Sequence, residues 1–211
     1  MVEVKLYVEG GGESKKLRIE CRKGFFEFLR KAGLAGSMPP IVACGSRNNA
    51  YESFRTASRM GQIALLLVDS ETGIDKAFQM GDPSQWKPWR HLGNPKNDRW
   101  KKPRNAQERD CHLMVQVMET WFLADPEALR SFFKMGSFNE KLHPEGTELE
   151  TWPKDKVYKA VEKATGGRQS GYDKGKHSFK LLEMINCNKV TAASPWAKRF
   201  VEETKKKMGI S

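Results

Sequence analysis

Apolar positions in the first 70 residues follow two periods, one typical of strands and the other of helices. Residues 4–8 alternate between apolar and polar, which predicts a short strand, and the apolar runs 41–44 and 63–68 predict two more. The run 63–68 is continuously apolar, which fits a strand that is buried on both faces of the sheet. Helical spacing follows Ser14 and Ser46, and serine is a good helix cap. The order strand, helix, strand, helix, strand predicts an α/β fold with a mostly parallel sheet flanked by helices.

The remainder of the chain combines a long irregular segment with a largely helical end. Residues 72–110 are rich in glycine and proline and contain three of the six tryptophans. This composition predicts an insertion after the third strand, in which the tryptophans pack internally rather than stack on bases. Residues 112–118 predict a fourth strand, with a helix as the alternative. Further helices are expected to begin at Pro126, Asp155, Ser178 and Ser194.

We therefore expect one domain spanning 1–211, with a sheet core in 1–71 and 111–125, an insertion in 72–110 and a mainly helical part in 126–211. No apolar run approaches the roughly 18 residues of a membrane-spanning helix, and the first ten residues lack an export signal. The four cysteines form no CxxC pair, which predicts reduced, mostly buried thiols. These features predict a cytoplasmic protein that does not enter a membrane.

Positive charge is in excess and unevenly distributed. The chain has 37 Lys+Arg against 26 Asp+Glu, a net charge of +11, of which +8 falls in residues 151–211 and +3 in residues 81–120. Such clustering favours a polyanion such as DNA or RNA as partner, because basic side chains release counterions from phosphates. The alternative is a set of basic helix faces that bind nothing.

Carboxylates stand where the predicted strands end. Glu9 directly follows the first strand, and Asp69 and Glu71 follow the third. Because the carboxyl ends of parallel strands share one edge of a sheet, we expect these acids to converge. Crowded carboxylates raise one another's pKa, and a hard divalent cation relieves that repulsion. The sequence thus predicts a site for one or two Mg²⁺ or Mn²⁺ ions, with Glu13 and Glu119 as further ligand candidates, although Glu13 also suits the first turn of a helix and Glu71 a loop.

Two segments are candidates for phosphate binding. Gly10 and Gly11 follow Glu9 and would let the backbone approach a phosphate closely. Lys174 and Lys176 lie in the polar stretch 172–178, where an ammonium group would balance negative charge on phosphorus. The alternative interpretation of that stretch is a solvated loop before a helix.

The residues around these acids resemble a known family. The motifs are Val8-Glu9-Gly10-Gly11-Gly12-Glu13-Ser14 and Leu67-Val68-Asp69-Ser70-Glu71, accompanied by matching segments at 112–125, 175–182 and 194–200. On these residues the chain resembles the bacterial domain-of-unknown-function family 4276, which looks like a Toprim domain. Toprim domains occur in topoisomerases, primases and the overcoming-lysogenization-defect (OLD) nucleases. The resemblance implies a Toprim-like, Rossmann-like sheet.

Toprim domains hold Mg²⁺ with a glutamate after the first strand and a D-x-D pair after the third. By resemblance, Glu9, Asp69 and Glu71 take these catalytic and metal-binding roles. The chain departs from the pattern in having Glu71 as the second acid of the pair, which lengthens that arm. The OLD-type pattern implies two further acids and a catalytic lysine. The candidates for the acids are Glu13 and Glu119, and the candidate for the lysine is Lys176, with Lys174 as the alternative.

The resemblance implies a Mg²⁺-dependent nuclease, the effector subunit of a phage-defence (abortive infection) system. A separate ATPase subunit is the expected partner, and the chain itself has no G-x-x-x-x-G-K-[ST] loop. One alternative is a non-catalytic nucleic-acid-binding or regulatory subunit. The other is a Mg²⁺-dependent phosphoryl-transfer enzyme that acts on a small phosphate ester. A homo-oligomer is compatible with each of these.

Overall fold

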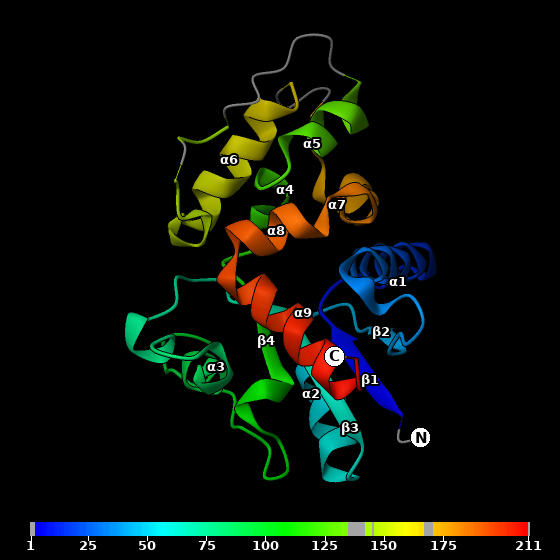
Figure 1. Cartoon of the computed structure of the whole chain (residues 1–211), viewed down its shortest axis with the longest axis vertical. Coiled ribbons are helices and arrows are strands. Elements are labelled where there is room, and N and C mark those ends of the chain that lie inside the picture. Colours follow the sequence, from blue (N-terminus) through cyan, green and yellow to red (C-terminus); the bar gives the residue numbers. More distant parts are fainter. Residues whose placement is uncertain (1–2, 135–141, 145, 167–170, 211) are drawn as a thin grey trace.

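The computed structural model describes residues 3–134, 142–144, 146–166 and 171–210. In this part of the chain, four strands form one parallel sheet in the order β2-β1-β3-β4. Leu6 of β1 pairs with Leu65 of β3, and Leu67 pairs with His112 of β4. The expected α/β fold with a parallel, Rossmann-like sheet flanked by helices is confirmed (Figure 1). The strands are β1 (Val4–Val8), β2 (Ile41–Ala43), β3 (Ile63–Asp69) and β4 (Cys111–Met114).

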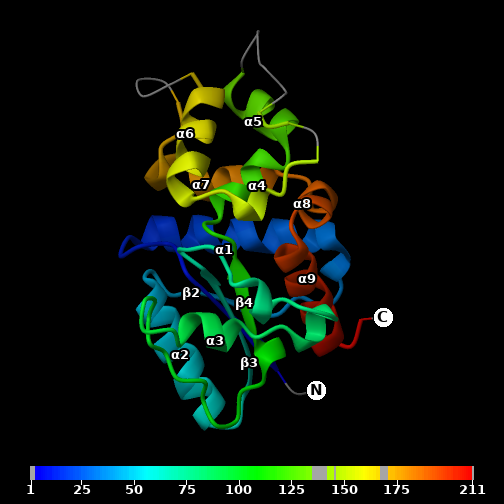
Figure 2. The same ribbon diagram turned by 90° about the vertical axis from the view of Figure 1, so that its left-hand side faces the viewer.

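The helices are divided between the flanks of the sheet and a layer beyond its carboxyl edge. Figures 1 and 2 show α4 to α8 gathered at the top, with the sheet, α2 and α3 below and α1 between. The bounds are α1 (Lys15–Leu29), α2 (Arg47–Arg59), α3 (Pro88–Leu92), α4 (Glu119–Leu123), α5 (Pro126–Phe133), α6 (Lys154–Ala164), α7 (Lys174–Met184), α8 (Cys187–Ala193) and α9 (Pro195–Lys207). A short π-helical stretch, Arg30–Leu34, continues α1.

The sheet divides the interior into two cores, as the alternation along β3 requires. Leu65 and Leu67 face a core formed with α1 and the C-terminal helices. Leu66 and Val68 face a second core formed with α2 and the insertion. Burial on both faces explains why this strand is continuously apolar, as the sequence predicted.

Several predicted boundaries shift in the structure. The fourth strand ends at Met114, four residues earlier than expected, and the chain enters the short helix α4 at Glu119. Helix α6 begins at Lys154, so Asp155 lies inside its first turn rather than at the cap. Helix α7 begins at Lys174 and not at Ser178, because the Asp173 side chain accepts a hydrogen bond from the Lys176 backbone N–H at 3.1 Å.

The tryptophans of the insertion pack internally, as predicted. Trp86 and Trp89 are buried, and Trp86 lies 4.7 Å from Trp196 of α9 between ring centroids. Trp100 stacks on Tyr51 of α2 at 4.5 Å with an interplanar angle of 6°. The insertion is therefore a layer packed on α2, β4 and α9 rather than a free loop.

No described helix is long and apolar enough to cross a bilayer. The four cysteines are free and buried, as the sequence predicted. Burial raises the pKa of Cys187 to about 11, which keeps this thiol neutral and unreactive at ordinary pH.

Arg199 of α9 holds the insertion to the sheet. Its side chain is only 1% exposed and donates to three backbone carbonyls: Nε to Pro83 (2.7 Å), Nη1 to Cys111 (2.8 Å) and Nη2 to Glu108 (2.8 Å). We expect Arg199→Ala to lower the free energy of unfolding by about 3 kcal/mol or more, because it leaves a cavity and orphaned buried carbonyls. Urea denaturation followed by tryptophan fluorescence measures this.

The matched control is Lys198→Ala on the same helix, where the side chain is 63% exposed. We expect a change within about 0.5 kcal/mol at this position. A loss below about 1 kcal/mol for Arg199→Ala would show that the three carbonyls find other partners and that this contact is not structural.

Candidate metal centre

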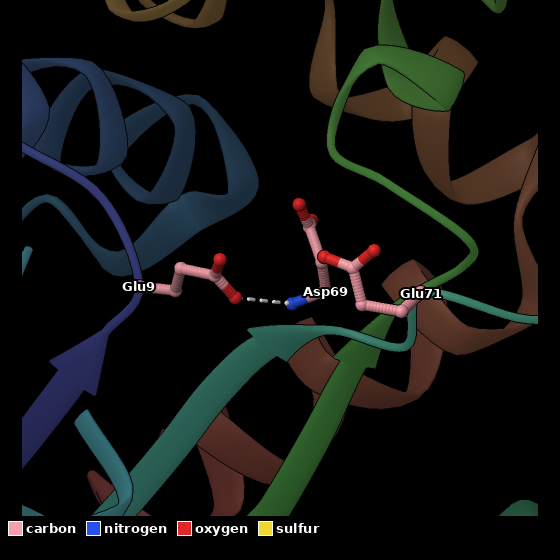
Figure 3. Close-up of side chains that lie close together, drawn as sticks. All are labelled: Glu9, Asp69 and Glu71. Carbon is pink, nitrogen blue, oxygen red and sulfur yellow. Dashed lines mark hydrogen bonds between the residues drawn. The ribbon is translucent and has the colours of Figure 1, made fainter. Parts of the chain in front are cut away.

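Three carboxylates converge at the carboxyl ends of β1 and β3. Glu9, Asp69 and Glu71 each present an oxygen, and these oxygens all lie within 4.8 Å of one another (Figure 3). The parallel pairing of Val8 with Leu67 places Glu9 beside the end of β3. The Asp69 backbone N–H donates to Glu9 Oε2 at 3.0 Å, and this bond fixes the Glu9 side chain over the neighbouring strand. The convergence predicted from the strand ends is therefore present.

Glu71 reaches the cluster through an unusual backbone conformation. Its φ is 64°, in the left-handed region, and its N–H donates to the Gln116 carbonyl at 2.8 Å. Its Oε2 lies 2.6 Å from Lys154 Nζ at the start of α6. An ion bound by Glu71 would therefore share this carboxylate with the Lys154 ammonium.

The glycines after Glu9 are required by packing. Gly10 and Gly11 have φ of 127° and 90°, and a Cβ on Gly10 would stand 2.8 Å from the Phe179 ring. The Gly10 N–H donates to the Gly45 carbonyl at 2.9 Å, so it is already occupied and not directed at a ligand. Both glycines nevertheless line a cavity of about 270 Å³ beside Glu9 and Asp69, which leaves room for a small group next to the acids.

Crowding and burial make the acids hard to ionise. Burial is the main cause that raises the pKa of Glu9 to about 7; Arg47 and the Asp69 N–H oppose it. Burial, followed by the charges of Glu9 and Glu119, raises the pKa of Asp69 well above its usual range. Asp69 is 3% exposed, and its Oδ1 accepts a hydrogen bond from the Met118 N–H at 2.8 Å. Positive charge placed beside these carboxylates would therefore favour their ionised form.

Glu119 and Lys174 extend the cluster on the side of Asp69. Glu119, at the start of α4, is fully buried; its Oε1 accepts a hydrogen bond from Tyr172 Oη at 2.7 Å. Its Oε2 is buried without a hydrogen-bond partner among the described residues. Lys174 Nζ lies 3.9 Å from Asp69 Oδ2 and 3.7 Å from Glu119 Oε1. Partial burial alone lowers the pKa of Lys174, but the two carboxylates outweigh it and the net shift is upward.

The family of the chain follows from comparison with known proteins. The model of DUF4276, a domain of unknown function, matches residues 8–204. The chain belongs to the DUF4276 family. No curated protein and no solved structure matches it.

Two of the predicted site residues of this DUF4276 chain lie away from the cluster. Glu13 is exposed and is not among the acids whose oxygens converge. The Lys176 side chain is 76% exposed and pairs with Asp173 at 3.6 Å, whereas Lys174 reaches the acids. Because α7 begins at Lys174, residues two apart lie on different sides of its first turn. Of the two lysines that the sequence offered, Lys174 is therefore the one whose ammonium lies beside the acids.

The sequence interpretation missed three basic or hydroxyl groups of the DUF4276 site. Arg47 Nη1 lies 3.9 Å from Glu9 Oε2, and the guanidinium also pairs with Asp98 of the insertion. Arg47 follows β2, so the strand-end rule that found Glu9 would also have found it. Lys154 carries no local signal, and the polar stretch 172–178 pointed to its lysines rather than to Tyr172. Both residues reach their partners, Glu71 and Glu119, only through long-range packing.

We expect Mg²⁺ or Mn²⁺ to stabilise the DUF4276 protein through this cluster. At an ion concentration of about 100 times the dissociation constant, the gain is about 2.7 kcal/mol, which is several degrees in melting temperature. Glu9→Gln should abolish the rise, because the substitution removes a ligand charge but keeps the acceptor for the Asp69 N–H. Thermal denaturation with and without the ion measures this. Glu13→Gln is the matched control and should retain the full rise.

Stability without metal should fall as the pH rises through this site. The pKa of Glu9 is about 7 when folded, against an ordinary value of 4.5, so between these pH values the folded state holds a proton that the unfolded state has lost. The contribution of Glu9 is thus largest below pH 4.5 and is lost as the pH approaches about 7. Urea titrations from pH 5 to 8 should show a loss for the wild type that exceeds that of Glu9→Gln by about 1 kcal/mol or more. Parallel curves would contradict the raised pKa.

Proposed function

We propose that this protein is a metal-dependent phosphodiesterase that cleaves nucleic acid. The observation that carries the proposal is the convergence of Glu9, Asp69 and Glu71, whose oxygens lie within 4.8 Å of one another at the carboxyl edge of the sheet. Carboxylates crowded in this way are stable as anions only beside positive charge. A divalent cation carries two positive charges on one small ion, whereas each lysine side chain that now borders the cluster carries only one.

The donor set fits a hard cation. Among the residues that the structure describes, the cluster consists of carboxylates with neither a histidine nor a thiolate, which is the ligand chemistry of Mg²⁺ and Mn²⁺. The buried Oε2 of Glu119, which has no hydrogen-bond partner in the described part of the chain, adds an acceptor near Asp69. Glu9, Asp69 and Glu71 would hold the ion. When bound, it would lower the pKa of a water molecule and neutralise charge on the phosphate oxygens.

The other residues have roles that follow from their positions. Lys174 presents its ammonium beside Asp69 and is placed to stabilise the negative charge that grows on a phosphoryl group. Tyr172 donates a hydrogen bond to Glu119 and orients that carboxylate. Arg47 lies next to Glu9 and holds the insertion against the site through Asp98. The cavity of about 270 Å³ provides the space in which a phosphate would meet these groups.

The choice of a nucleic acid as substrate rests on two observations. The motifs around Glu9 and Asp69 resemble those of Toprim domains, including those of OLD nucleases, and the net charge of +11 suits a polyanion. We extend the proposal to a Toprim-like effector subunit of a phage-defence system that works with a separate ATPase. The size of the cavity also suits a small phosphate ester, and this is the second candidate substrate.

Cleavage assays test the proposal directly. Plasmid DNA, single-stranded DNA, RNA and a chromogenic phosphodiester are incubated with the full chain in Mg²⁺, Mn²⁺ or EDTA. We expect metal-dependent cleavage of a nucleic acid that Asp69→Asn abolishes. Lys174→Ala should lower the rate roughly 100-fold, whereas Lys176→Ala should change it less than about threefold. A protein that binds nucleic acid but cleaves none, even with its proposed ATPase partner, would instead be a regulatory subunit.

A further inference from the structure

A groove beside α2 lies outside the metal centre. A cavity of about 470 Å³ is formed between α2 and residues 101–105 of the insertion. Its walls carry cationic side chains from both elements, and each of these residues is exposed: Arg55, Arg59, Lys101, Lys102 and Arg104. So dense a set of cations facing one space suits a ligand with several negative charges.

The groove is held open by bonds between its two walls. Tyr51 Oη of α2 donates to the Lys101 carbonyl at 2.8 Å. At the other end, Asn105 Nδ2 donates to the Ser58 carbonyl at 3.2 Å. Pro103 between them is buried. The loop is therefore tied to the helix at both ends, so a ligand would meet a preformed surface and lose little free energy in ordering it.

The charge of the groove is only partly neutralised within the protein. Arg55 pairs with Glu52 at 2.5 Å and Lys102 with Glu108 at 3.1 Å. Among the residues that the structure describes, no carboxylate pairs with the three remaining cations, Arg59, Lys101 and Arg104.

Some cations of the C-terminal part, where most of the net charge falls, are also paired. Lys189 pairs with Asp125 and Glu127, and Lys207 with Asp110, so these cations are already neutralised by their neighbours. Part of the positive charge of the C-terminal segment is therefore neutralised within the protein.

A continuous series of contacts joins the groove to the metal centre. Arg47 lies 3.9 Å from Glu9 Oε2, and its guanidinium stands 5.3 Å from the centroid of Trp100. Trp100 stacks on Tyr51 at 4.5 Å, and the Arg55 guanidinium stands 5.8 Å from the Tyr51 ring. The end of the groove at Tyr51 is thus linked to Glu9 through Trp100 and Arg47.

We propose that this groove binds the sugar–phosphate backbone of a nucleic-acid strand and leads it to the metal centre. This inference rests on the proposed function and names the surface that holds its substrate. From Arg47 to Arg59 the helix rises about 18 Å, a length that spans about five phosphates of one B-form strand. Contacts to phosphates fix the position of a strand without reading its sequence, so the groove gives affinity but no base preference.

Binding measured in EDTA separates the groove from catalysis. Fluorescence anisotropy of the full chain is recorded with labelled single-stranded DNA, single-stranded RNA and duplex DNA over a range of NaCl concentrations. The test variant combines Arg59→Gln, Lys101→Gln and Arg104→Gln. The control combines Lys159→Gln, Lys163→Gln and Lys198→Gln, which changes the net charge equally on α6 and α9. All six residues are exposed, so circular dichroism should show both variants folded.

We expect the groove variant to raise the Kd at least 10-fold. For a single strand, the slope of the log of the association constant against log salt should also decrease by about 2, because each lost phosphate contact lowers it by about 0.7. The control should change Kd less than about threefold. Equal losses in the two variants, or a wild type that binds none of the probes, would overturn the proposal. If the groove variant alone loses binding while the wild type cleaves nothing in any metal, the groove stands and the nuclease function fails.

Discussion

The parallel pairing of β1 with β3 is the constraint on which the site depends. It aligns Val8 with Leu67, so that Glu9, the residue after β1, meets the end of β3 and accepts a hydrogen bond from the Asp69 N–H. A shift of one residue would turn the apolar side chains of β3 to the wrong cores and move Glu9 away from Asp69. The same register therefore maintains both the interior and the acid cluster. The two cores stabilise an arrangement of charges that is unfavourable by itself.

Cations from separate elements offset this unfavourable charge. Arg47 begins α2, Lys154 begins α6 and Lys174 begins α7, and each lies within 4.0 Å of an acid of the cluster. Of these helices, α2 lies between two parallel strands and presents its N-terminal end to the carboxyl edge of the sheet, which adds favourable partial charge for carboxylates. The helical layer is thus coupled to the sheet by electrostatics as well as by packing. A metal ion would compete with these cations for the same oxygens.

The sequence could predict those site residues whose positions follow from the local pattern of apolar and polar residues. Glu9 and Asp69 end strands that their apolar residues reveal, and the parallel order of the sheet brings such ends together. Choosing between Lys174 and Lys176 required the exact start of α7, which depends on one hydrogen bond from the Lys176 N–H to Asp173. Lys154 and Tyr172 could not be found this way, since their partners are 83 and 53 residues away along the chain.

The insertion connects the acid cluster to the surface of the molecule. His91 donates from Nε2 to the Ser70 carbonyl at 2.9 Å and so holds the backbone between Asp69 and Glu71. The same segment supplies Asp98, which pairs with Arg47, and Trp100, which stacks on Tyr51 of α2. A displacement of this segment by a ligand in the groove would therefore act on the backbone that positions two of the three acids. In the proposed function, substrate binding in the groove and the geometry of the acid cluster would be coupled through this one packed layer.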